Sequence, residues 1–213
     1  MGAWTQTDSS AGDGYLLLAD ISGYTAFMAG VEQAHGVDFS GGIPAGFAVL
    51  GALLDAVVEG VQPDFGVVKL EGDAVFAIAP ADTLDGHGGS VLSQLQTVHR
   101  SFHARRVEAR QAQDHVCTAC PAVGSLDLKM VIHRGRVVRQ TVGSQSELLG
   151  PAVNVAHRLL KNTVQSRIGY RPYLFLTDAA ANGLGLAQIG LEHREEYPDV
   201  GRIQGRIVDL GES

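Results

Sequence analysis

Residues 69–78 of the chain read KLEGDAVFAI, and the predicted fold depends on this stretch. Apolar runs over residues 65–70 and 74–78 predict two strands joined by Glu71, Gly72 and Asp73. Glycine accepts a positive φ and aspartate tolerates a tight turn, so the pattern is typical of a β-hairpin. Lys69 and Asp73 place charges at the ends of runs that look buried, where a charge is costly unless something pairs with it. Either a salt-bridged turn or a functional site explains the two charges.

A second stretch, YLLLADISGYT over residues 15–25, predicts a central strand that ends in Asp20, with a helix beginning just after Gly23. Asp20 can cap that helix. Alternatively, Asp20 and Asp73 lie at two strand ends and can share a hard divalent cation, which prefers oxygen ligands and usually brings a phosphate substrate. The two stretches leave both interpretations open.

The composition predicts an ordinary globular chain. It has 213 residues, of which 45% are hydrophobic, enough for one well-buried core. The formal net charge of −7 argues against nucleic acid or an anionic membrane as the main partner. Residues 1–14 are interpreted as a flexible tail without targeting features, and residues 15–213 as a single domain. No apolar run is long enough to cross a bilayer, so we expect a cytoplasmic protein.

The chain has two cysteines, Cys117 and Cys120, in the sequence HVCTACP. Together with His115 they can supply three ligands to Zn²⁺, but no fourth ligand is adjacent. A redox pair and two reduced thiols on a loop are the other interpretations.

Hydrophobic periodicity predicts the remaining elements. Leu126 and its successors alternate apolar with polar, and Gly135 is interpreted as the turn of a second hairpin. Residues 143–151 are expected to form a loop. The predicted order is a strand at 16–21, helices at 25–34 and 45–61, the hairpin at 65–78, a helix at 90–113, strands at 126–133 and 136–142, a helix at 152–161, a strand at 173–176, a short helix capped by Thr177, and strands at 188–196 and 202–210. This order predicts an α+β sandwich with helices on one face of a mixed sheet.

Four motifs appear in register: ADISGYT at 19–25, KLEGDA at 69–74, IHRG at 132–135 and GPAVNVAHRL at 150–159. With them the chain resembles the catalytic domain of the class III nucleotidyl cyclases, the adenylate and guanylate cyclase superfamily, over roughly residues 15–210. It is similar in particular to an uncharacterised bacterial branch that shares the cysteine-rich loop and the sequence HRLLKN. The resemblance implies a ferredoxin-like βαββαβ core with extra strands.

The resemblance also implies roles for individual residues. Asp20 and Asp73, with the carbonyl of Ile21, match the ligands of two Mg²⁺ or Mn²⁺ ions. Lys69 matches a lysine that reads the purine, and Glu147 falls where adenylate cyclases usually carry aspartate. This Lys/Glu pair favours ATP, although the extra methylene of glutamate shifts a hydrogen bond in the base pocket.

The resemblance assigns the remaining substrate contacts to a helix and to a late basic residue. Asn154 and Arg158 are four residues apart, so they share a helix face, and they match the pair that orients the ribose and stabilises the transition state. The family also has a basic residue near the end of the domain that contacts the triphosphate, and in this chain Arg202 or Arg194 is expected to take that place.

The implied activity is conversion of ATP to 3′,5′-cyclic AMP and pyrophosphate. In the superfamily a head-to-tail dimer places the metal-binding residues of one subunit opposite the helix residues of the other. This chain carries both sets, so we expect a homodimer with two equivalent sites. A catalytically silent protein that binds a nucleotide or another ligand as a sensor or scaffold is the alternative. A cyclase acting on GTP or on a pyrimidine nucleotide is a further one. His133 and His157 are expected to be buried, hydrogen-bonded imidazoles.

Overall fold

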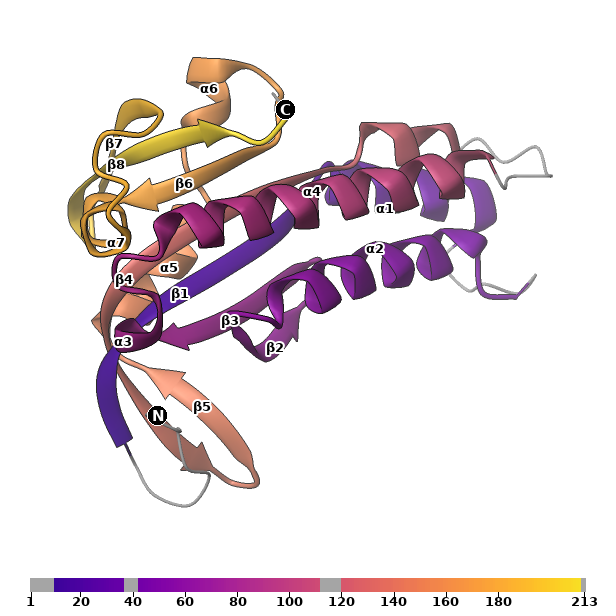
Figure 1. The fold of residues 1–213 in the computed structure, drawn as a ribbon. Helices are drawn as coiled ribbons and strands as arrows, with labels where there is room; N and C mark the ends of the chain where they lie inside the picture. The colour runs from indigo at the N-terminus through magenta and orange to yellow at the C-terminus, as the bar shows by residue number, and fades with distance from the viewer. Residues whose placement is uncertain (1–9, 37–41, 112–119, 212–213) are drawn as a thin grey trace.

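The computed structural model of the chain describes residues 10–36, 42–111 and 120–211. Its centre is a mixed sheet in the order β2-β3-β1-β4-β6-β8-β7 (Figure 1). The strands are β1 Ser10–Ser22, β2 Gly66–Glu71, β3 Ala74–Pro80, β4 Asp127–Val142, β5 Gln145–Leu149, β6 Tyr173–Thr177, β7 Leu191–Tyr197 and β8 Gly201–Asp209. The first four form the antiparallel order β2-β3-β1-β4, which is that of a ferredoxin-like βαββαβ core. β6 adds to β4 in parallel, and β8 and β7 follow as antiparallel extra strands.

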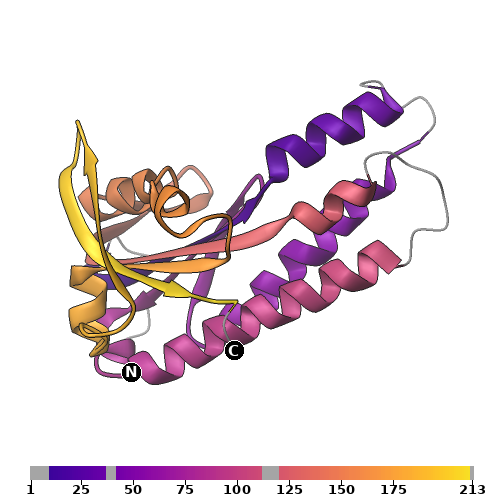
Figure 2. The ribbon, with the colours of Figure 1, turned by 90° about the horizontal axis from the view of Figure 1, so that it is seen from above.

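The helices divide between the two faces of the sheet. α1, α2, α4 and α7 pack on one face, and α5 and α6 on the other. Figure 2 shows α1, α2 and α4 extending past one end of the sheet. The helix bounds are α1 Tyr24–His35, α2 Ala45–Val61, α3 Ala81–Leu84, α4 Gly88–Gln111, the 3₁₀ helix η1 Cys120–Ser125, α5 Pro151–Leu159, α6 Val164–Ile168 and α7 Asp178–Leu184. Among the residues that the structure describes, no helix is long and apolar enough to cross a membrane.

The core lies on both sides of β1. Tyr15, Leu17 and Ala19 are buried in the cluster that contains α2 and α4. Leu16 and Leu18 point to the other face and pack with α5. The prediction that helices lie on one face is therefore wrong. β1 is apolar at consecutive positions, which is typical of a strand that is buried on both faces.

The predicted turn at Gly135 is also wrong, because β4 runs without interruption from Asp127 to Val142. A Cβ atom on Gly135 would lie 2.7 Å from the Cβ of Ala152 in α5. Close packing of the helix on the strand, rather than chain reversal, therefore requires the glycine. The reversal comes at Gly143, where φ is +63°. The expected loop over residues 143–151 contains β5, which pairs with the far half of β4.

The boundary of the N-terminal tail differs from the prediction. β1 begins at Ser10, and its first residues pair antiparallel with β4, from Ser10 opposite Arg139 to Gly14 opposite Gly135. Five residues assigned to the tail therefore belong to the sheet. The hairpin at 66–80, the helix at 45–61 and the Thr177 cap are confirmed, the last by a hydrogen bond from the Ala180 N–H to the Thr177 side chain.

Candidate functional site

The two predicted metal-binding carboxylates lie side by side at one end of the central strands. Asp20 is the last but two residue of β1 and pairs with Ala74, while Asp73 precedes Ala74 in the β2–β3 turn. The N–H of Ile21 donates a hydrogen bond of 3.2 Å to the carbonyl of Asp73, which fixes the turn against the strand. Asp20 does not cap α1, because none of the described side chains caps that helix at its N-cap residue, Gly23.

Burial and then the neighbouring negative charge of Asp20 raise the pKa of Asp73. Like charges at partly buried positions raise a carboxyl pKa because ionising one opposes ionising the other. A divalent cation between the two groups would remove this repulsion. Within the described residues, no group of three or more His, Cys, Asp or Glu side chains could hold a metal ion. Two carboxylates are nevertheless what Mg²⁺ usually takes from a protein when substrate phosphates supply further oxygens. Asp20 and Asp73 therefore fit a divalent cation that binds together with the phosphates of a substrate.

A lysine that the sequence interpretation missed occupies this end of the sheet. The Lys129 Nζ lies 2.8 Å from Oδ2 of Asp20, and the two side chains are only 20% and 15% exposed. Lys129 also donates a hydrogen bond of 3.2 Å to the carbonyl of Leu160, just after α5. It opposes Asp20 in the β1–β4 register. The alternation of residues 126–133 could have placed Lys129 on the face opposite Leu128 and Met130, but its partner required the register.

The predicted base-reading pair also comes together. Lys69 on β2 and Glu147 on β5 are far apart in sequence, and Nζ of Lys69 lies 3.5 Å from Oε2 of Glu147. Glu71 joins them, because its Oε1 lies 3.1 Å from Nζ of Lys69. The hydrogen bond to Glu71 is the largest influence that raises the pKa of Lys69. The salt bridge that explains Lys69 is thus made with glutamates on both sides, and not with Asp73.

His157 and His133 both make hydrogen bonds. The His157 Nε2 lies 2.9 Å from Oε2 of Glu71, and its Nδ1 lies 2.8 Å from the Val153 carbonyl. The His157 side chain is 32% exposed, so it is half-buried rather than buried. His133 lies 3.0 Å from the hydroxyl of Thr177, and burial lowers its pKa to about 4.

Helix α5 presents Asn154 and Arg158 on one side. Pro151 occupies its first turn, where a proline is well tolerated. Ala152, Ala156 and Leu159 are buried against the sheet. The opposite side of the helix lines a cavity of about 540 Å³, bounded by Asn154, His157, Arg158, Lys161, Asp199 and Val200.

Arg158 is engaged by a residue that the sequence interpretation also missed. Its Nε donates a hydrogen bond of 2.7 Å to Oδ2 of Asp199. Asp199 lies between β7 and β8, in a turn whose sequence carries no sign of this partner. About half of each side chain is exposed, so the pair is open to exchange with another anion.

The late basic residue lies elsewhere. Ile203 and Ile207 of β8 pack with α5 and α6, so the alternation of the strand directs Arg202 to the other face, where it opposes Glu196 in register. Arg194 lines a different cavity. Among the described residues, no hydrogen bond or ion pair links the carboxylates of Asp20 and Asp73 to Asn154 or Arg158. Cys117 lies outside the described residues, as does the side chain of Cys120, so the zinc prediction has no structural counterpart here.

Comparisons with known sequences identify a protein family and a relative for this chain. Residues 50–168 match the family model described as "Protein of unknown function (DUF2652)". An uncharacterized protein of Mycobacterium tuberculosis is 30% identical over 165 residues, which cover 76% of this chain and 73% of the relative.

Among solved structures, the guanylyl cyclase Cya2 aligns with a TM-score of 0.67 at 13% identity, over 96% of this chain and 95% of that one. The adenylyl cyclase CyaB from P. aeruginosa aligns with a TM-score of 0.60 at 13% identity, over 95% and 96%. A bacterial light-regulated adenylyl cyclase aligns with a TM-score of 0.64 at 16% identity over 95% of this chain, which spans about half of that protein, 52%. The chain therefore belongs to the DUF2652 family, and its fold is that of the adenylyl and guanylyl cyclase catalytic domains.

Proposed function

We propose that the protein is a nucleotidyl cyclase that converts ATP to 3′,5′-cyclic AMP and pyrophosphate. The observation that carries this proposal is that Asp20 and Asp73 come from separate strand ends and meet at one end of the sheet, where the N–H of Ile21 donates to the carbonyl of Asp73. The contact between Lys69 and Glu147 supports the same function, because the two residues match the base-reading pair of adenylate cyclases.

Each residue has a defined task in this reaction. Asp20, Asp73 and the carbonyl of Ile21 would hold two Mg²⁺ or Mn²⁺ ions, which lower the pKa of the ribose 3′-hydroxyl and neutralise the triphosphate. The 3′-oxygen forms a bond to the α-phosphorus, the bond to the α–β bridging oxygen breaks, pyrophosphate leaves, and the hydroxyl proton passes to water. Arg158 stabilises the charge on the α-phosphate with its planar fork of donors. The phosphate competes with Asp199 for that guanidinium.

A homodimer would complete the site, since among the described residues no hydrogen bond or ion pair joins the acidic pair to Asn154 or Arg158 of the same chain. Figure 1 shows β5 and the second half of β4 projecting from the body of the molecule. On this projection Val138, Val142 and Leu149 are 37%, 55% and 44% exposed. Apolar side chains on a projecting hairpin favour contact with another protein surface. We propose a head-to-tail dimer in which the carboxylates of one subunit face Lys69, Glu147, Asn154 and Arg158 of the other, with Arg202 on the triphosphate.

The test is incubation of the purified chain with ATP, GTP, CTP and UTP, each with Mn²⁺ or Mg²⁺, followed by chromatography. We expect cyclic AMP and pyrophosphate from ATP, and loss of at least 100-fold in the rate for Asp73→Ala and for Arg158→Ala. The controls Asp55→Asn and Arg105→Gln, which change exposed charges on α2 and α4, should keep the wild-type rate.

The two inactive variants also test the dimer. Mixing Asp73→Ala with Arg158→Ala rebuilds one intact site per heterodimer, so activity should return to about a quarter of the wild-type value when subunits exchange freely. A mixture that stays inactive after exchange contradicts the shared site. A cyclic product from GTP or a pyrimidine nucleotide alone would reassign the substrate.

A catalytically silent, nucleotide-binding protein is the second candidate. It is favoured by the two ion pairs that engage the proposed catalytic groups, Lys129 with Asp20 and Asp199 with Arg158. This candidate predicts that ATP binds with equal affinity with and without Mn²⁺, and that no nucleotide yields a cyclic product.

A further inference from the structure

A buried cluster of polar side chains lies on β7, away from the acidic pair. The carboxylate of Glu195 is only 4% exposed, and its Oε1 accepts hydrogen bonds from the backbone N–H and the hydroxyl of Thr163, at 2.6 and 2.9 Å. The His193 Nε2 lies 2.6 Å from the same oxygen. A buried carboxylate is costly unless it is hydrogen-bonded, and here three donors meet one oxygen. The cluster therefore fixes both the ring of His193 and the chain at Thr163.

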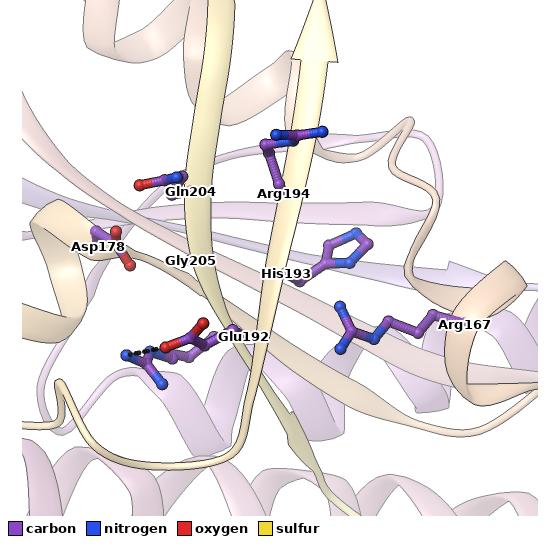
Figure 3. A pocket seen from close by; sticks show the side chains of 8 residues that line it. Arg167, Asp178, Glu192, His193, Arg194, Gln204 and Gly205 are labelled. Atoms are coloured by element: carbon purple, nitrogen blue, oxygen red, sulfur yellow. Dashed lines mark ion pairs between the residues drawn. The ribbon is translucent and has the colours of Figure 1, made fainter.

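His193 also lines a cavity of about 620 Å³ (Figure 3). This size falls in the range of about 300–1,000 Å³ that small-molecule sites occupy. The charged residues of the cavity wall are three arginines and two acids, Arg167, Arg194, Arg206, Asp178 and Glu192. Arg206 is paired with Glu192 at 3.1 Å. The remaining charges give the wall an excess of one positive charge in a chain of net charge −7.

Two groups on the wall have unused hydrogen-bonding capacity. Within the described part of the chain, no hydrogen bond or ion pair engages the Arg167 guanidinium or Nδ1 of His193. The His193 side chain is 7% exposed, so its ring is buried except where it meets the cavity. Figure 3 shows Arg167 reaching from α6 toward β7, so that its guanidinium lies below the His193 ring in this view.

We propose that this cavity binds the phosphate group of a small phosphate monoester, held between Arg167 and Nδ1 of His193. The guanidinium fork matches two phosphate oxygens. Nδ1 donates to a phosphate oxygen when the ring is protonated and accepts from a phosphate hydroxyl when it is neutral. The volume leaves room for the organic part of the ester.

The site has a direct connection to the end of α5. His193 and Thr163 share the same oxygen of Glu195, and Thr163 follows Lys161 and Asn162 in the segment that ends α5. A ligand that polarises the imidazole changes the hydrogen bond between His193 Nε2 and Oε1 of Glu195. The partial charge on this oxygen, which also accepts from the Thr163 N–H, changes with it. The inference does not depend on whether the protein makes a cyclic nucleotide.

The test is an NMR titration of the full chain, labelled with ¹⁵N, at constant ionic strength. The probes are inorganic phosphate, glycerol 3-phosphate and acetate. We expect saturable shifts of the His193 ring nitrogens and of the Thr163 amide with both phosphates, and at least 10-fold weaker binding of acetate. Arg167→Gln removes the exposed guanidinium and should weaken both phosphates at least 10-fold, whereas Arg105→Gln, an exposed arginine of α4, should bind as the wild type does.

Three results would overturn the proposal. Shifts that grow linearly with phosphate and do not saturate mean that the cavity holds no specific phosphate site. Wild-type phosphate affinity in folded Arg167→Gln, checked by circular dichroism, removes Arg167 from the site. Equal affinity for acetate and glycerol 3-phosphate replaces the phosphate assignment with a carboxylate one. Arg158→Ala separates this cavity from that of α5, because the His193 and Thr163 shifts should persist in this variant.

Discussion

Replacing Lys129 with methionine should strengthen the binding of Mn²⁺ to the acidic pair. The substitution keeps most of the side-chain volume and removes the charge that lies 2.8 Å from Asp20. At this separation and an effective dielectric constant of about 20, Coulomb attraction is about 6 kcal/mol. Desolvation of the two charges offsets most of it. What remains is roughly 1.5–3 kcal/mol, typical of a hydrogen bond between charged groups. A metal ion that no longer competes with Lys129 should therefore bind about 10- to 100-fold more tightly.

The assay is a titration with Mn²⁺ followed by the electron paramagnetic resonance signal of the free ion, without nucleotide. Lys129→Arg keeps the positive charge and should bind as weakly as the wild type. Arg105→Met removes an exposed cation on α4 and controls for the change in net charge. Lys129→Met loses the ion pair with Asp20 and also the hydrogen bond to the Leu160 carbonyl, so without metal we expect its free energy of unfolding to fall by about 2.5–4 kcal/mol.

Unchanged or weaker Mn²⁺ binding by a folded Lys129→Met variant would refute the competition between Lys129 and the metal. Binding that persists in Lys129→Met/Asp73→Asn would refute the assignment of the ion to the acidic pair.

Three further predictions concern stability, each measured by urea unfolding. Gly135→Ala should lower the free energy of unfolding by about 1–3 kcal/mol, because the new Cβ would lie 2.7 Å from the Cβ of Ala152. The control is Gly51→Ala on α2, where a Cβ meets no atom within 4 Å; it should raise the free energy of unfolding by about 0.5–1 kcal/mol. Burial lowers the pKa of His133 from 6.5 to about 4, so between these pH values the unfolded chain binds a proton at His133 that the folded chain does not. The free energy of unfolding should therefore fall by up to about 3 kcal/mol between pH 6.5 and 4. His133→Gln should show a smaller fall, and a pH profile identical to that of the wild type would contradict this. The raised pKa of Asp73 means that its ionised form opposes folding. In the absence of metal, Asp73→Asn should therefore be more stable than the wild type at pH 7, and the difference should disappear at pH 3.

The parts of the fold that follow from local pattern were predictable. Gly72 between two apolar runs marks the β2–β3 hairpin, and the three/four spacing of leucine and valine marks α2. Asp20 and Asp73 could be predicted to lie close together, because each is an acid at the end of an apolar run that predicts a strand. Lys69 and Glu147 were placed by resemblance alone, since no local pattern connects residues 78 positions apart.

What failed depends on contacts between distant elements. Gly135 looks like a turn residue in sequence, and only the approach of Ala152 reveals it as a packing position. Lys129 and Asp199 are single charges in ordinary sequence surroundings, and their roles follow only from their partners, which are Asp20 on the neighbouring strand and Arg158 on α5. Neither partnership follows from the periodicity of one segment.

The continuity of β4 has a mechanical consequence. Lys129 lies near its beginning, and Gln140, which pairs with Glu147, lies 11 residues later, about 36 Å along an extended chain at about 3.3 Å per residue. β4 pairs with β1 from Asp127 to Arg139 without a break at Gly135, so one continuous ladder links the end that carries Lys129 to the hairpin that carries Glu147. A displacement of Lys129 away from Asp20 would therefore also move the hairpin that carries Glu147.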